Sequence, residues 1–119
     1  MEWKFNSEAP IYLQIMEQIK AQIATGVLKP GQKIAAVREI ALEAGVNPNT
    51  VQKALSELER EGFLYSERTA GRFVSDNKEK AENVQSELCK QYMDAFTENM
   101  GKLGYSPKEA AKKYSEYVE

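Results

Sequence analysis

The side chains best placed to do chemistry in this sequence are the small hydrogen-bonding residues of the run Asn47-Pro48-Asn49-Thr50. Amide side chains pair with adenine edges, and threonine suits a phosphate or a thymine methyl group. Asn47 and Pro48 also suit the N-cap and the first turn of a helix. The run therefore predicts a helix, from Asn47 to about Glu61, whose first turn faces double-stranded DNA.

A shorter helix is predicted directly before this run, over residues 36–44, with the bend at Gly45. Two helices joined by a short glycine turn form a helix-turn-helix, in which the second helix enters the DNA major groove. Arg38 begins the first helix and has no acidic residue three or four positions later. We therefore expect its guanidinium to be free for DNA, although a solvated surface charge is the alternative. Asn49 and Thr50 could likewise serve only as local caps.

Flanking patterns complete a winged helix over residues 1–76. Ile11, Ile15, Ile19 and Ile23 recur every four residues and predict an amphipathic helix over residues 10–25. Pro30-Gly31 predicts a tight turn, of type II. Two β-type runs, residues 63–66 and 72–75, predict a hairpin, the wing. The expected fold class is mainly α with a small β-hairpin, a winged helix-turn-helix plus a C-terminal helical region.

Residues 77–119 are predicted to form that second region. After a polar segment over residues 76–80, expected to be a hinge, apolar side chains recur every four residues along one long helix. Ser106-Pro107-Lys108-Glu109 is a capping box that begins a final helix. Two helices alone cannot build a core, so we expect a homodimer through Leu88, Tyr92, Phe96, Met100 and Tyr114. Folding back onto the first domain and enclosing a small-molecule pocket are the alternatives.

Composition excludes several kinds of site. The 119 residues contain no histidine and one cysteine, Cys89, so Cys/His zinc sites, an intrachain disulfide and His-based catalytic pairs are excluded within the chain. No cofactor or metal is expected, and Cys89 is predicted to be a partly buried hydrophobe. No apolar run approaches membrane-spanning length and no signal peptide is apparent, so the expected location is the cytoplasm, with no membrane partner.

The net charge of −2 is unusual for a DNA-binding chain. A local basic stripe is nevertheless enough for phosphate attraction. The basic residues in segments predicted to face DNA are Lys33, Arg38, Lys53, Arg68 and Arg72.

Five blocks of sequence together resemble the GntR family of bacterial transcription regulators. They are Pro10-Ile11-Tyr12-x-Gln14-Ile15, Gly26-x-Leu28-x-Pro30-Gly31, Val37-Arg38-Glu39-Ile40-Ala41, Gly45-Val46-Asn47-Pro48-Asn49-Thr50-Val51 and Leu58-Glu59-x-x-Gly62. Their order and spacing match the family over about residues 9–75. The Asn-Pro-Asn-Thr-Val stretch and the short two-helix tail resemble the YtrA-like branch in particular.

The resemblance implies a homodimeric repressor that reads a two-fold operator, often near genes for ABC-type transporters. By position it implies DNA contacts from Arg38 and, in the recognition helix, from Asn47, Pro48, Asn49, Thr50, Gln52 and Lys53. It also implies minor-groove contacts from the wing tip around Arg68, Thr69 and Gly71. Two departures stand out: Ile34-Ala35-Ala36 replaces the usual Leu-Pro-Ser, and Thr69-Ala70-Gly71-Arg72 replaces Gly-x-Gly-Thr. Arg72 is expected to supply a cation in exchange for the lost glycine.

Three other functions compete with this interpretation. A winged helix can be a protein-interaction module, which the near-neutral charge would suit. The same regulator could be gated by an unidentified small-molecule effector. An enzyme is the third alternative, and the absence of histidine and of clustered carboxylates weighs against it.

Overall fold

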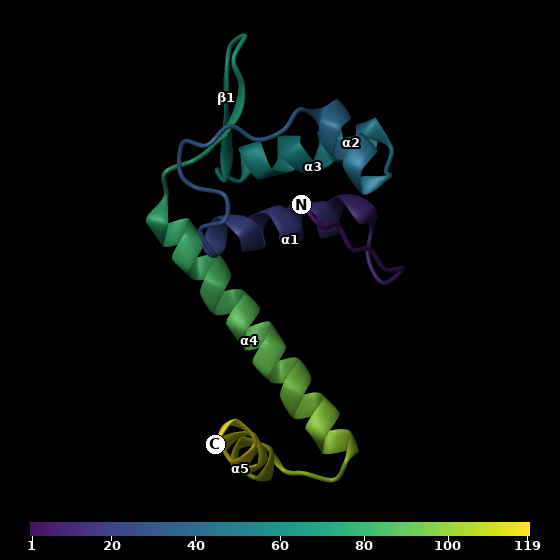
Figure 1. Ribbon diagram of the computed structural model, residues 1–119, viewed down its shortest axis with the longest axis vertical. Coiled ribbons are helices and arrows are strands. Elements are labelled where there is room, and N and C mark those ends of the chain that lie inside the picture. Colours follow the sequence, from purple (N-terminus) through teal and green to yellow (C-terminus); the bar gives the residue numbers. More distant parts are fainter. The chain divides into compact units, whose positions relative to one another are not determined.

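Helix α1 (Ile11–Ala24) opens the regular structure of the chain, whose computed structural model describes residues 1–119. It is followed by α2 (Val37–Ala44), α3 (Pro48–Arg60), β1 (Leu64–Glu67), β2 (Gly71–Val74), α4 (Lys78–Lys102) and α5 (Pro107–Val118). Figure 1 shows these helices and the hairpin. The expected elements are all present, and their ends lie within one or two residues of the prediction except at the start of α4.

Contacts divide the chain into two compact units, Met1–Gln85 and Ser86–Glu119. The boundary expected at residues 76/77 therefore precedes the division between the units, which falls inside α4. The expected hinge over residues 76–80 is wrong in its second half, because α4 already begins at Lys78. The Asn77 side chain accepts a hydrogen bond from the Lys80 backbone N–H (3.1 Å) and so starts the helix. Val84 then packs against the core of the first unit.

The core of the first unit lies between α1, α2, α3 and the hairpin. In Figure 1, α1 and α2 both pack along α3. The largest side chains fully withdrawn from solvent are Ile15, Val51, Leu55, Leu58, Leu64 and Val74. The inward face of α3 is therefore the one that its apolar spacing predicted, and its opposite face stays free for a partner.

The ends of α2 and α3 explain how the helix-turn-helix bends. Gly45 lies in the left-handed region (φ 69°), where an L side chain is disfavoured, and ends α2. The Asn47 side chain accepts a hydrogen bond from the Asn49 backbone N–H (2.8 Å), and Pro48 occupies the first turn. Both predicted roles are confirmed. In contrast, α2 begins after Ala36 with no side-chain cap.

The Pro30-Gly31 turn anchors the base of the hairpin. Gly31 has φ 79°, and the Gln32 N–H donates to the Lys29 carbonyl (2.9 Å), as a type II turn requires. The segment after the turn pairs with β2: Gly31 N–H donates to the Val74 carbonyl (2.8 Å) and Val74 N–H to the Gln32 carbonyl (2.9 Å). The wing is thus a two-stranded antiparallel hairpin whose base is held on one side by this segment.

The second unit consists of the rest of α4 and α5. Ser106 and Glu109 form the predicted capping box at the start of α5: Glu109 N–H donates to Ser106 Oγ (3.2 Å), and Ser106 N–H donates to Glu109 Oε1 (3.0 Å). This hydrogen bond to the charged carboxylate lowers the pKa of Glu109. Ala110 is the unit's buried apolar residue.

Most other apolar side chains of this second unit face solvent on the single chain. Tyr92 is 68% exposed, and the Phe96 ring meets the Tyr114 ring edge-on at 5.9 Å between centroids. Leu88 and Met100 are half-buried. The expectation that Cys89 is partly buried is wrong, because it lies on the exposed side of α4. No helix of the chain is both long enough and apolar enough to cross a membrane.

Candidate nucleic-acid interface

The outer face of α3 carries the residues that the sequence singled out. Asn49, Gln52 and Lys53 are exposed, whereas Thr50 is half-buried. Gln52 donates a hydrogen bond to Ser56 Oγ on the next turn (3.0 Å). The Asn49 side chain makes no hydrogen bond within the chain, while that of Asn47 is used as the cap. The structure therefore separates two similar amides: Asn47 holds the helix, and Asn49 is free to bind.

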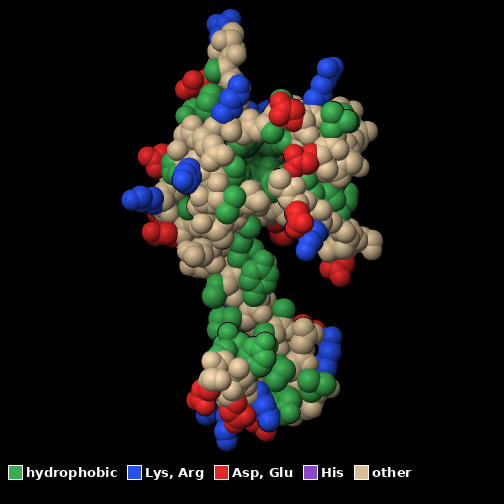
Figure 2. Space-filling view, in the orientation of Figure 1, with side chains coloured by type: hydrophobic (Ala, Val, Ile, Leu, Met, Phe, Trp, Pro, Cys, Tyr) green, Lys and Arg blue, Asp and Glu red, His purple; other side chains and the backbone are tan.

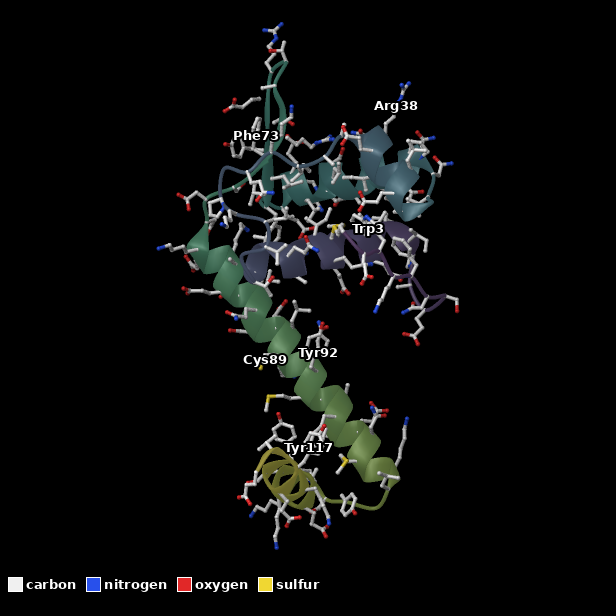
Figure 3. The ribbon with its side chains drawn as sticks, in the orientation of Figure 1. Trp3, Arg38, Phe73, Cys89, Tyr92 and Tyr117 are labelled. Carbon is white, nitrogen blue, oxygen red and sulfur yellow. The ribbon has the colours of Figure 1, made fainter.

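Arg38 projects from the first turn of α2 into solvent (Figure 3). It points to the side on which the hairpin stands above the helices. It forms no ion pair within the chain, as the absence of an acidic residue three or four positions later predicted. A free guanidinium can make a bidentate contact to a phosphate or to a guanine edge.

The acidic residues near the end of α3 are all paired with cations. Arg60 Nη2 lies 2.6 Å from the Glu57 carboxylate, Lys20 Nζ lies 2.9 Å from that of Glu61, and Arg72 Nε lies 3.6 Å from that of Glu59. The hydrogen bond from Arg60 is the main reason why the pKa of Glu57 is lowered. This pairing reduces the repulsion that three carboxylates would exert on a nearby phosphate backbone.

The wing tip carries an exposed cation and a strained turn. Arg68 is exposed at the tip, and Figure 2 shows a basic side chain at the end of the hairpin. Thr69 has φ 70°, the one residue other than glycine at positive φ, and the Ala70 N–H donates to the Glu67 carbonyl (3.1 Å). The tight turn thus survives the loss of the family's first glycine, with threonine forced into a left-handed conformation.

Gly71, at φ 112°, keeps the second glycine of that wing pattern. A Cβ there would lie 3.0 Å from Cε of Lys33, so the lysine side chain passes directly over the strand. Sequence reasoning placed Lys33 near DNA but did not find this contact, because it joins segments far apart in the chain.

Arg72 has a different environment from the one expected. Its side chain is only 20% exposed, its Nε is buried with no hydrogen-bond partner, and its guanidinium lies beside Glu59 of α3. It therefore joins the base of the wing to the recognition helix instead of projecting from the wing as a free cation. The DNA contact predicted for Arg72 remains a prediction. The position of its guanidinium beside Glu59 disfavours it.

Replacing Thr69 by glycine is expected to stabilise the chain. A left-handed conformation costs an L residue about 1–2 kcal/mol, and glycine avoids this cost. Glycine loses roughly 0.5–1 kcal/mol more conformational entropy on folding, which offsets part of the gain. The melting temperature should rise by about 2–6 °C in a calorimetric scan. Ala70→Gly, which relieves no positive φ, should lower it. Equal shifts in both variants would contradict the argument.

Comparison with known proteins agrees with this geometry. The pattern of the bacterial regulatory proteins, gntR family, matches residues 11–74. The chain belongs to the GntR family. The HTH-type transcriptional regulator YhcF of Bacillus subtilis is 37% identical over 109 residues, which cover 92% of this chain and 90% of YhcF. The HTH-type transcriptional repressor YtrA of the same organism is 48% identical over 71 residues, 60% of this chain and 55% of YtrA.

Two solved structures extend the likeness. A GntR family transcriptional regulator from Listeria monocytogenes has a TM-score of 0.79 at 36% identity, covering 97% of this chain and 100% of that one. The DNA-binding domain of AraR in complex with operator ORX1 has a TM-score of 0.58 at 34% identity. That alignment covers 63% of this GntR chain and 96% of the AraR domain.

Proposed function

We propose that this chain is a sequence-specific DNA-binding transcription regulator whose α3 lies in the major groove. The observation that carries the proposal is the outer face of the helix-turn-helix: Asn49 and Arg38 are both exposed and unpaired, and the acids near the end of α3 are paired with cations. The hairpin, whose tip carries the exposed Arg68, rises from the same unit (Figure 1). Such an arrangement offers base contacts, phosphate contacts and a minor-groove contact together.

The similarity to a family member bound to its operator supports this proposal. The AraR domain was solved on DNA, and the repressor YtrA and the regulator YhcF share the same helix-turn-helix region. We infer that this chain represses transcription from an operator in the cytoplasm, as a non-enzymatic regulator. We further propose that its operators lie near transporter genes. Gating of the same regulator by an unidentified small-molecule effector is an extension of this proposal.

A mobility shift with DNA from upstream of the chain's own gene tests the function. Wild-type protein should form a specific complex whose affinity falls steeply as salt rises, because lysines and arginines release counterions from phosphates. Arg38→Ala should weaken the complex roughly ten-fold or more, the value of a charged hydrogen bond. Lys112→Ala, in α5, is the matched control and should bind as the wild type does. A salt slope near zero would favour the protein-interaction module instead.

We also propose that the chain is a homodimer through the second unit. Tyr92 (68% exposed), Tyr114 (55%) and Phe96 (37%) place aromatic rings in solvent on a unit too small to bury them. A second copy is the partner that a two-fold operator calls for. The interface set predicted from sequence, Leu88, Tyr92, Phe96, Met100 and Tyr114, is kept in this proposal.

Tyr92→Asp is expected to convert the dimer into a monomer. A buried interface tyrosine is commonly worth about 2 kcal/mol, so the dimer dissociation constant should rise at least about 30-fold. Sedimentation equilibrium measures the change. Val27→Asp, at a residue 62% exposed in the turn after α1, should leave association unaltered. A wild-type chain that stays monomeric at high concentration, or a Tyr92→Asp variant that dimerises normally, would refute the interface.

A further inference from the structure

Lys53, on the outer face of α3, lies against an aromatic ring from another helix. Its Nζ is 3.9 Å from the centroid of the Tyr12 ring on α1. This distance is well inside the roughly 6 Å range in which a ring face attracts a cation. Tyr12 is itself half-buried and packs against the core of the first unit, so its ring is held in place.

Lys53 attracts the Glu57 carboxylate but does not form an ion pair with it. The nearby acid on its own helix, Glu57, binds Arg60 at 2.6 Å, and Lys53 forms no ion pair with any carboxylate. An ammonium has three N–H donors, and on a ring face it keeps those that point away from the ring for other acceptors. The Lys53 ammonium is therefore fixed at the seam between α1 and α3, with its donors available to solvent or to a ligand.

Fixing a lysine in advance changes how well it binds. A free lysine side chain loses about 2 kcal/mol of rotamer entropy when it is immobilised. A ring that already restricts the ammonium removes part of this loss from the binding step. The Tyr12 ring on α1 thus restricts the Lys53 ammonium before binding, which no residue of α3 does.

We propose that Tyr12 is a positioning residue for DNA binding, whose ring holds the Lys53 ammonium where α3 meets a backbone phosphate. The inference rests on the proposed function and names the part that α1 plays in it. Tyr12 lies outside the helix-turn-helix. Its contribution to DNA binding therefore depends on the packing of α1 against α3.

The interaction between the ring and the ammonium is tested without DNA. A ring face shields protons above it, so the ε-methylene protons of Lys53 should resonate upfield in the wild-type chain and in Tyr12→Phe. The shift should disappear in Tyr12→Leu, which keeps an apolar side chain but no ring. An unshifted Lys53 resonance in the wild-type chain overturns the inference, whatever the DNA affinity.

The functional step is tested by a double-mutant cycle on the operator. Tyr12→Leu should lower affinity about two- to five-fold per half-site when Lys53 is present and have no effect in a Lys53→Ala chain. Tyr12→Phe should bind as the wild type does. Lys53→Ala should reduce the salt slope by about 0.9 for each phosphate that the lysine neutralises.

Three results would overturn the positioning role. They are an equal effect of Tyr12→Leu with and without Lys53, a Tyr12→Phe variant as weak as Tyr12→Leu, and a salt slope unchanged by Lys53→Ala. Tyr12→Met provides a second ring-free variant if Tyr12→Leu folds poorly. A wild-type chain with no operator affinity at all would instead contradict the proposed function, a different outcome from these three.

Discussion

Replacing Asn49 by alanine is expected to relax sequence discrimination at the base pair that it contacts in each half-site and leave thermal stability unchanged. The side chain is exposed and makes no hydrogen bond within the protein, so the fold loses nothing. A bidentate amide–adenine pair is worth about 1–3 kcal/mol of discrimination, or roughly 5- to 150-fold for each half-site. Competition mobility shifts with operator and unrelated DNA measure the ratio.

Asn47 and Asn83 provide the controls for this variant. Asn47 accepts the Asn49 N–H as the N-cap, so Asn47→Ala should lower stability by about 1 kcal/mol and the melting temperature by roughly 4–8 °C. Asn83, exposed on α4, should tolerate alanine without either effect. If Asn49→Ala keeps full discrimination, or if it destabilises the fold as much as Asn47→Ala does, the assignment of the two amides is wrong.

Leu55→Ala is expected to have the largest effect on folding. Leu55 is completely buried on the face of α3 that packs in the core of the first unit. Removing such a side chain costs about 2–5 kcal/mol, against roughly 5–15 kcal/mol of total stability for a small domain. The urea midpoint should fall by at least about 1 M with an unchanged slope.

Leu42 gives a matched control, because it is the same residue type at 84% exposure on α2. Leu42→Ala should change the free energy of unfolding by less than about 0.5 kcal/mol. Both variants should be compared at one protein concentration, since association would add to stability. A similar cost at both positions would mean that the core of the first unit is not where the structure places it.

Most of the fold could be predicted from sequence because its signals are local. The four-residue spacing of Ile11, Ile15, Ile19 and Ile23 fixes one helix, and Asn47-Pro48 begins another within a single residue of the observed start. Caps and glycine turns act on residues within four positions of one another. Such patterns keep their meaning whatever the rest of the chain does.

The site was predicted less fully because several of its contacts are tertiary. The Arg72–Glu59 pair and the Lys53–Tyr12 contact each join different elements, and no spacing rule within one element signals them. The sequence therefore predicted that Arg72 supplies a free cation on the wing, whereas its guanidinium lies beside α3. The division of roles between Asn47 and Asn49 also needed the observed cap, because either amide could have supplied it.

The wing tip lacks the first glycine of the family's Gly-x-Gly-Thr pattern, a departure that the sequence already shows. The structure nevertheless keeps the tight turn and places the strain on Thr69. The pairing of β2 with the segment after the Pro30-Gly31 turn supports the hairpin from its base, which explains how the tip can tolerate this conformation.

The measurement that tests the central claim most directly is a scan of the operator with 7-deazaadenine, which removes one major-groove acceptor at a time. Wild-type binding should weaken when the substituted adenine is the one that Asn49 contacts, at one symmetric position in each half-site. Asn49→Ala should be insensitive to the same substitution. No sensitive position in the wild type, or equal sensitivity in both proteins, would contradict the account of α3 as the helix that reads bases.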